Sequence, residues 1–292
     1  MELAVSFRFN DGTKVRRFGY GAMRLTGQPG NFGPYGAWDE GKKVLRRALE
    51  LGINFIDTAR AYGPGWNERL IADALYPYPE GLFIATKGGV VKKSATERYL
   101  DGSPDGLRRD CEESLKNLRV ECIDLYQLHW VDPAVPLSES VQGLARLQEE
   151  GKIRLIGLSN ITVEQLEEAR SIAQIASVQN RYSVGERQGD PMVDCCVREG
   201  IAFIPYGPLG ADPMKQGTPL AWAEGALANV GKSLGATATQ VALSWLLHRA
   251  PNILPIPGTT SIAHLEENVA AAKLNPTQDQ LQQLASVAGR EN

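Results

Sequence analysis

The chain of 292 residues is poor in the residues that build metal centres and disulfide frameworks. It has four cysteines and three histidines. No two cysteines form a C-x-x-C pair, and the histidines do not cluster near them, so we expect no metal site. Cys195 and Cys196 are adjacent, an arrangement that rarely forms a bond within the pair. Reduced thiols of this kind are typical of a cytoplasmic protein.

Long apolar runs and blocks of one charge are also missing. No apolar stretch approaches the ~18 residues of a membrane-spanning helix, and the start, MELAVSFRFNDG, lacks the basic and apolar regions of a signal peptide. The formal net charge is -3, without a run of lysines or arginines. Nucleic-acid binding is therefore not expected. We expect a cytoplasmic protein, a monomer or small homo-oligomer, that binds neither membranes nor nucleic acids.

What the chain does contain is an ordinary globular composition, 43% hydrophobic and 22% charged. No linker or low-complexity stretch divides it, so we expect residues 1–292 to form one domain. The first segment, VSFRFNDGTKVRRFGYG, alternates polar and apolar residues around Asp11-Gly12, which predicts a β-hairpin.

After the hairpin, short apolar runs alternate with amphipathic helical patterns. The runs are GYGAM, INFID, LFIATK, IDLYQLH, RLIGLSN, IASVQN, IAFIPY and ILPIPG. Helices are predicted between the runs, among them 39–51, 104–118, 138–150, 162–173, 236–248 and 278–288. Ser103, Thr162 and Ser261 are predicted to cap the start of a helix, and Gly52, Gly151 and Gly200 to follow the end of one.

Eight apolar runs between helices predict repeated β-α units and a parallel sheet covered on both faces. Two architectures fit this pattern, an eight-stranded barrel and an open doubly wound sheet. The open sheet would need a G-x-G-x-x-G turn after an early strand, and GYGAM does not supply one. We therefore favour an α/β fold, a (β/α)8 TIM barrel with the N-terminal β-hairpin plugging one end.

Polar residues gather where the predicted strands end, which is the rim that carries the active site in barrel enzymes. Asp57 ends INFID, Lys87 ends LFIATK and His129 ends IDLYQLH, while Tyr62 lies in the loop after Asp57. Each has an ordinary interpretation alone: a hydrogen-bonded histidine, a solvated lysine, a packed tyrosine. A buried carboxylate, however, costs several kcal/mol unless it is paired, and consecutive strand ends place Lys87 within reach of Asp57.

This group of side chains suits carbonyl reduction. Hydride addition to a carbonyl carbon leaves an alkoxide that needs a proton, and a phenol with a pKa near ~10 donates poorly at neutral pH. The Lys87 ammonium would lower the pKa of Tyr62, Asp57 would keep Lys87 charged, and an N–H of His129 would hold the substrate oxygen. The sequence therefore predicts Tyr62 as the proton donor.

The chain resembles the aldo-keto reductase family along essentially its whole length. The resemblance rests on NFIDTARAYG, IATKGG, DLYQLHW, GKIRLIGLSN, VQNRYS, IPYGPLG and IPGTTSIAHLEEN, and is strongest to bacterial members related to pyridoxal reductases. It implies a barrel that binds a nicotinamide cofactor without a Rossmann fold. It also implies a catalytic tetrad of Asp57, Tyr62, Lys87 and His129.

The same resemblance assigns cofactor contacts to the later strand ends. They are Ser159, Asn160 and Gln179 at the carboxamide, Tyr206 on the nicotinamide ring, Met23 and Asp57 near the ribose end, Gly207, Pro208 and Leu209 along the pyrophosphate, Gly258, Thr259, Thr260, Ser261 and His264 at the 2′-phosphate, and Glu267 and Asn268 at adenine.

The 2′-phosphate end departs from the family pattern. Many members carry a lysine and an arginine where this chain has Gly258 and His264. Hydroxyls and helix N-terminal N–H groups can still hold a phosphate, but His264 is largely neutral near pH 7. We expect NADPH as the cofactor, with weaker discrimination against NADH. A plain loop and helix cap is the alternative interpretation of PGTTS.

The expected substrate is a small or planar aldehyde, with ketones as a further class and pyridoxal as the named candidate. Its pocket walls would be Met23, Trp66, Trp130 and Tyr35, because aromatic rings suit flat substrates; packing under the loops is the alternative for each tryptophan. The long C-terminal tail of steroid and aldose reductases is missing, which favours an open site. The composition of GADPMKQGTPL indicates mobility in the loop 209–222.

Two other functions stay open at this stage. A cofactor-binding sensor or channel-subunit-like protein would turn over slowly, but the chain begins almost at its hairpin, without the expected extension. A lyase or isomerase with a Schiff base at Lys87 would need an unpaired lysine, whereas Asp57 is its predicted partner.

Overall fold

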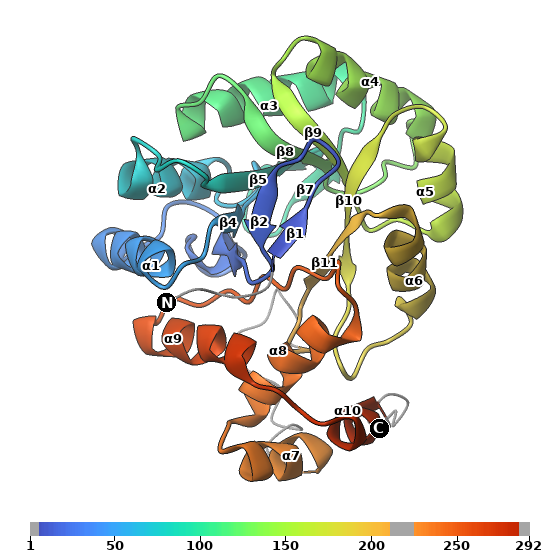
Figure 1. Cartoon of the computed structure of the whole chain (residues 1–292). Coiled ribbons are helices and arrows are strands. Elements are labelled where there is room, and N and C mark those ends of the chain that lie inside the picture. The colour runs from blue at the N-terminus through green and yellow to red at the C-terminus, as the bar shows by residue number, and fades with distance from the viewer. Residues whose placement is uncertain (1–5, 211–224, 286–292) are drawn as a thin grey trace.

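The computed structural model describes residues 6–210 and 225–285, and the loop expected to be mobile lies mostly outside these ranges. A curled parallel sheet forms the centre of the fold (Figure 1), with the strand order β11-β10-β9-β8-β5-β4-β3. Its strands are β3 (Tyr20–Gly21), β4 (Phe55–Asp57), β5 (Phe83–Gly88), β8 (Ile123–Leu128), β9 (Ile153–Ser159), β10 (Ile175–Arg181) and β11 (Ala202–Tyr206).

The eighth predicted strand, ILPIPG, closes the barrel without forming a full ladder. On one side the amide of Leu254 donates to the carbonyl oxygen of Phe203 (2.8 Å), and on the other the amide of Gly19 donates to Pro255 (2.9 Å). Pro255 and Pro257 have no N–H to donate, which limits the pairing to a single bridge. The prediction of a (β/α)8 barrel is confirmed.

The predicted N-terminal hairpin is also present. Strands β1 (Ser6–Arg8) and β2 (Lys14–Arg16) pair antiparallel across the Asp11-Gly12 turn. The hairpin lies across the N-terminal end of the barrel, facing the viewer in Figure 1. Phe9, just after β1, stacks on Phe83 of β5 with ring centroids 5.0 Å apart, so the hairpin closes the barrel interior with apolar contacts.

Helices surround the sheet, and several begin and end where the sequence predicts. The side chains of Ser103, Thr162 and Ser261 accept hydrogen bonds from the first turns of their helices. The helices are α1 (Trp38–Glu50), α2 (Trp66–Leu75), α3 (Pro104–Leu118), α4 (Leu137–Glu149), α5 (Val163–Arg170), α6 (Asp190–Glu199), α7 (Ala226–Leu234), α8 (Ala238–Arg249), α9 (Ile262–Ala270) and α10 (Gln278–Ala285), with 3-10 turns η1 (Ala22–Arg24) and η3 (Ala271–Lys273). Within 6–210 and 225–285, no helix combines the length and apolar character needed to cross a bilayer.

One pair of strands was not predicted. Strands β6 (Val90–Lys92) and β7 (Arg98–Leu100) form a second antiparallel hairpin between β5 and α3. Each strand has three residues, and the sequence between Val90 and Leu100 is largely polar, so its composition resembles a loop. The hairpin follows the carboxyl end of β5, and it therefore lies beside the rim where the polar strand ends meet.

Candidate active site

The buried ion pair between Asp57 and Lys87 lies at the centre of the rim. Nζ of Lys87 is 2.6 Å from Oδ2 of Asp57 and 2.7 Å from the carbonyl oxygen of Thr58. Asp57 and Lys87 are 2% and 1% exposed. Burial lowers the pKa of Lys87, but the Asp57 carboxylate and Tyr62 outweigh it and raise the pKa above its usual value. Lys87 is therefore a charged ammonium near neutral pH.

The second oxygen of Asp57 connects the ion pair to two amides of the barrel wall. Nε2 of Gln179 donates to Oδ1 of Asp57 at 2.8 Å, and Nε2 of Gln127 lies 3.4 Å from the same atom. Donors on both oxygens fix the orientation of the carboxylate. Gln127, on β8, escaped prediction because nothing in the sequence distinguishes it from other buried strand residues.

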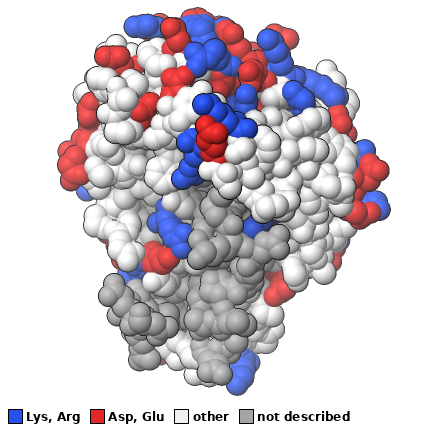
Figure 2. Space-filling view, turned by 180° about the vertical axis from the view of Figure 1, so that it is seen from behind, with Lys and Arg blue, Asp and Glu red and all other residues white. Residues whose placement is uncertain are grey.

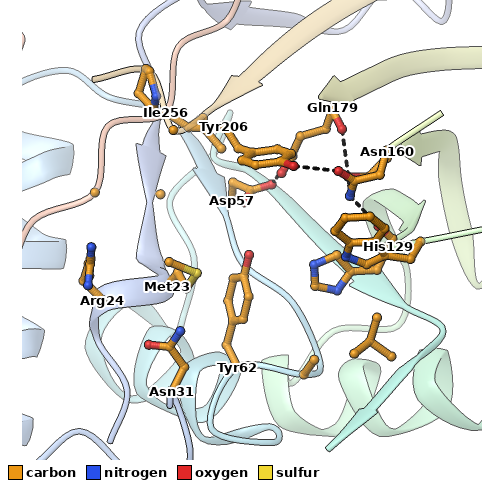
Figure 3. Close-up of a pocket in the computed structure, with 18 of the residues that line it drawn as sticks. Met23, Arg24, Asn31, Asp57, Tyr62, His129, Asn160, Gln179, Tyr206 and Ile256 are labelled. Carbon is orange, nitrogen blue, oxygen red and sulfur yellow. Dashed lines mark hydrogen bonds between the residues drawn. The ribbon is translucent and has the colours of Figure 1, made fainter. Parts of the chain in front are cut away.

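Tyr62 reaches this site from the loop between β4 and α2. The loop is held in place by Asn67, whose side chain bonds the hydroxyl of Thr58 (2.6 Å) and the carbonyl oxygens of Ala22 and Leu25 (2.9 and 2.8 Å). Nζ of Lys87 lies 5.2 Å from the centroid of the Tyr62 ring. These contacts place the phenol at the pocket wall, with its hydroxyl pointing toward Asp57 (Figure 3).

The pKa of Tyr62 moves in the opposite direction to the expectation. Burial raises it, the Lys87 ammonium lowers it, Asp57 raises it again, and the net shift is upward. The ammonium thus offsets only part of the desolvation cost of a phenolate. In this site Tyr62 is held as a neutral phenol, which is the form that can donate a proton.

His129 faces Tyr62 across the pocket. Their rings lie edge to face, with centroids 5.9 Å apart and planes at 81°. Burial lowers the pKa of His129 well below 6.5, and the charges of Lys87, Arg98 and Lys92 lower it further. The imidazole is therefore neutral. Its Nδ1 is buried without a hydrogen-bond partner in the described part of the chain, a feature that needs explanation and that fits a ring prepared for a ligand.

The residues expected at the carboxamide form one hydrogen-bonded cluster. Oγ of Ser159 donates to the carbonyl oxygen of Gln179 (2.8 Å), Nδ2 of Asn160 donates to the carbonyl oxygen of His129 (3.0 Å), and the hydroxyl of Tyr206 donates to Oδ1 of Asn160 (2.7 Å). Asn160 has a φ of 58°, which asparagine tolerates better than most residues. The amide oxygen keeps a second lone pair, so the cluster fits a nicotinamide carboxamide beside the Tyr206 ring.

One cavity of about 280 Å³ joins these groups. It is lined by thirteen of the predicted site residues: Met23, Asp57, Tyr62, His129, Trp130, Ser159, Asn160, Gln179, Tyr206, Gly207, Pro208, Leu209 and Gly258. Lys87 lies beneath it, bonded to Asp57. Figure 3 shows the labelled members pointing into a common space from several strands and loops.

The cavity reaches Gly258 but not the residues expected at the adenosine end, which are Thr259, Thr260, Ser261, His264, Glu267 and Asn268. Ser261 caps α9, and the carboxylate of Glu267 accepts a hydrogen bond from Thr237 (2.7 Å). A Cβ on Gly258 would lie 2.5 Å from the carbonyl oxygen of Gly21. The close approach of these two backbones leaves no room for a lysine at 258.

Trp66 and Tyr35, expected as substrate walls, do not line this cavity. Trp66 begins α2 and packs edge to face on Trp38 of α1, with centroids 6.1 Å apart and the Arg69 guanidinium over its ring. Tyr35 is half-buried and packs against a hydrophobic core cluster. The start of α2 turns Trp66 toward α1, and a role for either residue as a substrate wall stays a prediction. Trp130, in contrast, is on the cavity wall.

The cavity also has lining residues that the sequence did not single out: Gly21, Arg24, Asn31, Ala61, Val90, Lys92, Arg98, Ile256 and Pro257. Lys92 and Arg98 come from the unpredicted β6–β7 hairpin. VVK and RYL do not alternate polar and apolar residues, and three-residue strands are too short to show a distinctive period.

Comparison with known proteins places this arrangement in a family. The aldo/keto reductase family model matches residues 17–288. The match covers most of the chain, so the chain belongs to the aldo/keto reductase family. It is accordingly an oxidoreductase that depends on NAD(P)H.

Individual members match over nearly the whole length. An uncharacterised oxidoreductase of Schizosaccharomyces pombe is 44% identical over 265 residues, covering 88% of this chain and 82% of that protein. Pyridoxine 4-dehydrogenase of Escherichia coli is 43% identical over 288 residues, covering 96% and 98%. An aldo-keto reductase structure from Klebsiella pneumoniae in complex with NADPH has 26% identity and a TM-score of 0.82, covering 97% and 94%.

Proposed function

We propose that this protein reduces aldehydes, and ketones as a second class, to alcohols with NADPH, and that Tyr62 is the proton donor. The observation that carries the proposal is the buried Asp57–Lys87 pair beside the phenol of Tyr62, with a neutral His129 facing that phenol across one cavity. A proton donor, a positioned ammonium and an N–H donor then meet where a carbonyl group would lie.

Bound NADPH would supply a hydride from C4 of its nicotinamide to the carbonyl carbon. The Ser159–Asn160–Gln179 cluster would hold the carboxamide, and Tyr206 would lie against the ring. An N–H of neutral His129 would donate to the carbonyl oxygen as negative charge develops on it. Tyr62 would transfer its phenolic proton to that oxygen, and the adjacent Lys87 ammonium would stabilise the phenolate left behind. The products are the alcohol and NADP⁺.

Several observations support NADPH as the preferred form of the cofactor. The Klebsiella pneumoniae relative was solved with NADPH. Gly258 stands where many family members have a lysine. Arg24 of η1 lines the cavity beside Gly258, and its Cγ lies 3.9 Å from the position that a Cβ on Gly258 would take. A guanidinium thus lies near the cofactor path. His264, where many family members have an arginine, is exposed, so we propose weaker discrimination against NADH than a lysine–arginine pair would give.

For the substrate, we propose a small planar aldehyde such as pyridoxal. Met23 and Trp130 line the cavity and offer apolar surface to a flat ring. The Escherichia coli relative is named as a dehydrogenase of pyridoxine, an aromatic alcohol whose oxidation is the reverse of aldehyde reduction. A Schiff-base role for Lys87 is disfavoured, because a lysine paired with Asp57 stays protonated and is a poor nucleophile.

The first test is oxidation of NADPH and NADH with pyridoxal, 4-nitrobenzaldehyde, methylglyoxal and a ketosteroid, followed by the absorbance of the reduced nicotinamide. Turnover of aromatic aldehydes with NADPH supports the proposal, and the ratio of the two cofactors measures discrimination at the phosphate end. Tight NADPH binding without turnover of any carbonyl would overturn it in favour of a cofactor-binding sensor.

A further inference from the structure

The β6–β7 hairpin places two positive charges directly opposite each other. Lys92 pairs with Arg98 in the register of the two strands, and like charges at paired positions of a sheet are destabilising. No acidic side chain offsets them in residues 6–210 and 225–285. Lys92 donates instead to the carbonyl oxygens of Gly30 (2.7 Å) and Asn31 (3.3 Å), and Arg98 has no salt bridge there.

The neighbouring residue Lys93, unlike Lys92 and Arg98, has an acidic partner. Lys93 lies 3.4 Å from Glu97 and its ammonium is over the ring of Tyr99. It does not line the cavity. Lys92 and Arg98 do, so the unneutralised charges of the hairpin are the two that face the active site.

Both charges lie close to the reacting end of the cavity. They share its lining with Val90, His129 and Trp130, and both act on the imidazole of His129, whose pKa is lowered first by burial and then by Lys87, Arg98 and Lys92. Burial together with the charge of Arg98 also lowers the pKa of Lys92. An anion between the two side chains would relieve this repulsion.

The cofactor does not account for these charges. The residues proposed for its pyrophosphate, Gly207 to Leu209, and for its phosphate end, Gly258, lie on other segments of the wall, with Arg24 beside Gly258. Asp57 is the one carboxylate among the described lining residues, and it is already paired with Lys87. Figure 2, seen from the side opposite to Figure 1, shows a group of Lys and Arg side chains above the middle of this face, with an Asp or Glu side chain among them.

We propose that Lys92 and Arg98 form a subsite for an anionic group, a carboxylate or a phosphate, carried by the carbonyl substrate. The inference rests on the proposed reductase function and narrows its substrate class to anionic aldehydes. A guanidinium binds either anion through two parallel hydrogen bonds, and the ammonium adds a compact second charge. An anion held at the hairpin would leave the carbonyl end of a short planar molecule directed at His129 and Tyr62.

The kinetic test compares substrates that differ only in the anion. We expect 4-formylbenzoate to have a kcat/KM about tenfold higher than its methyl ester, the size of effect that a charge-assisted hydrogen bond gives at a partly exposed site. Pyridoxal 5′-phosphate against pyridoxal forms the phosphate arm, so the two arms identify which anion is preferred. The higher kcat/KM of the anionic substrates should come from a lower KM rather than from a higher kcat. Equal kcat/KM values within both pairs would overturn the proposal.

Arg98→Gln is the diagnostic variant, because the Arg98 side chain has no salt bridge within 6–210 and 225–285. It should bring the ratio of kcat/KM for the anionic substrate to kcat/KM for the methyl ester down toward one. Lys93→Gln removes one charge from the same hairpin away from the cavity, and it should change neither substrate. Equal losses on both substrates in Arg98→Gln, or the same loss in Lys93→Gln, would contradict a specific subsite.

A binding measurement separates this proposal from the reductase function. Calorimetry of the NADP⁺-loaded enzyme with benzoate and with benzamide needs no turnover. Benzoate binding that Arg98→Gln weakens about tenfold, with no selectivity in benzamide binding, supports the subsite even if no carbonyl is reduced. Benzoate binding that is the same in the parent and in Arg98→Gln overturns the subsite, whether or not the enzyme reduces aldehydes.

Discussion

Nζ of Lys87 lies 2.6 Å from Oδ2 of Asp57, and both side chains are buried. Removing one partner of such a pair leaves the other charge buried and unpaired. We therefore expect Lys87→Met to lower the free energy of unfolding by about 3–5 kcal/mol and to remove reductase activity. Urea denaturation of the protein without cofactor measures the first effect.

The double variant Asp57→Asn/Lys87→Met is the matched control. It has no unpaired charge, so it should regain part of the lost stability while remaining inactive. Lys93→Gln, an exposed lysine on the β6–β7 hairpin, should leave stability nearly unchanged. A Lys87→Met variant as stable as the parent would show that Asp57 is not held as a buried carboxylate.

Tyr62→Phe removes one hydroxyl and keeps the ring that faces His129. General acid catalysis contributes typically about 10²–10⁴-fold, and a loss of kcat in that range is expected for aldehyde reduction. NADPH affinity, measured by fluorescence titration, should stay within about twofold, since no hydrogen bond to the cofactor is assigned to this hydroxyl. Tyr76→Phe, at an exposed tyrosine on the outer surface, is the control. Retained kcat in Tyr62→Phe would assign the proton to another group.

The proximity of Asp57, Tyr62 and Lys87 could be predicted because each ends a strand or follows one, and parallel strands bring their carboxyl ends to one rim. Asp57, Lys87 and His129 therefore meet although they are far apart in the chain. The pKa of Tyr62 could not be predicted, because its direction depends on how far burial outweighs one ammonium. The packing of Trp66 on Trp38 could not be predicted, because the sequence position of Trp66 says nothing about which way the first turn of α2 faces. The β6–β7 hairpin was missed because its strands are too short to show a period.

Protonation of His129 should affect the pH dependence of stability more than the pH dependence of kcat. Its pKa is lowered well below 6.5 by burial first and by the nearby cations second, so the folded protein holds a neutral ring while the unfolded chain binds a proton. The free energy of unfolding should therefore fall as the pH drops below about 6.5, the ordinary histidine value. In His129→Gln this part of the pH dependence should disappear.

The same shift predicts that kcat of the parent enzyme shows no loss from His129 protonation between about pH 6 and 8. Denaturation curves at several pH values and kcat profiles over the same range measure the two effects. An identical pH slope of stability in the parent and in His129→Gln would show that the ring titrates normally.

Trp130 and Trp66 are equally exposed, at 37% each. Of these two residues, Trp130 lines the cavity and Trp66 does not. We expect Trp130→Ala to raise KM for aromatic aldehydes about tenfold, because the substrate loses an aromatic contact surface. Trp66→Ala removes a ring that packs on Trp38, so it should lower stability and leave KM unchanged. Steady-state kinetics and thermal unfolding of both variants separate these effects. A raised KM in Trp66→Ala would indicate that Trp66 contacts the substrate.

A substitution at the phosphate end of the cofactor path should improve the use of NADPH. His264 is exposed on the first turn of α9, so His264→Arg adds a fixed charge without displacing any neighbour. We expect it to lower KM for NADPH about three- to tenfold and to leave KM for NADH unchanged, since only NADPH carries the 2′-phosphate. His264→Gln controls for the change in shape.

Restoring the lysine at the other position should fail for a structural reason. A Cβ at Gly258 would lie 2.5 Å from the carbonyl oxygen of Gly21, and a Cβ at Gly21 would lie 2.6 Å from that of Ile256. These are backbone contacts at the closure of the barrel, so Gly258→Lys and even Gly258→Ala should destabilise the fold without improving the preference for NADPH. A stable Gly258→Lys variant with a lower KM for NADPH would mean that the two segments can separate, and that the glycine reflects the choice of cofactor rather than the packing of the barrel.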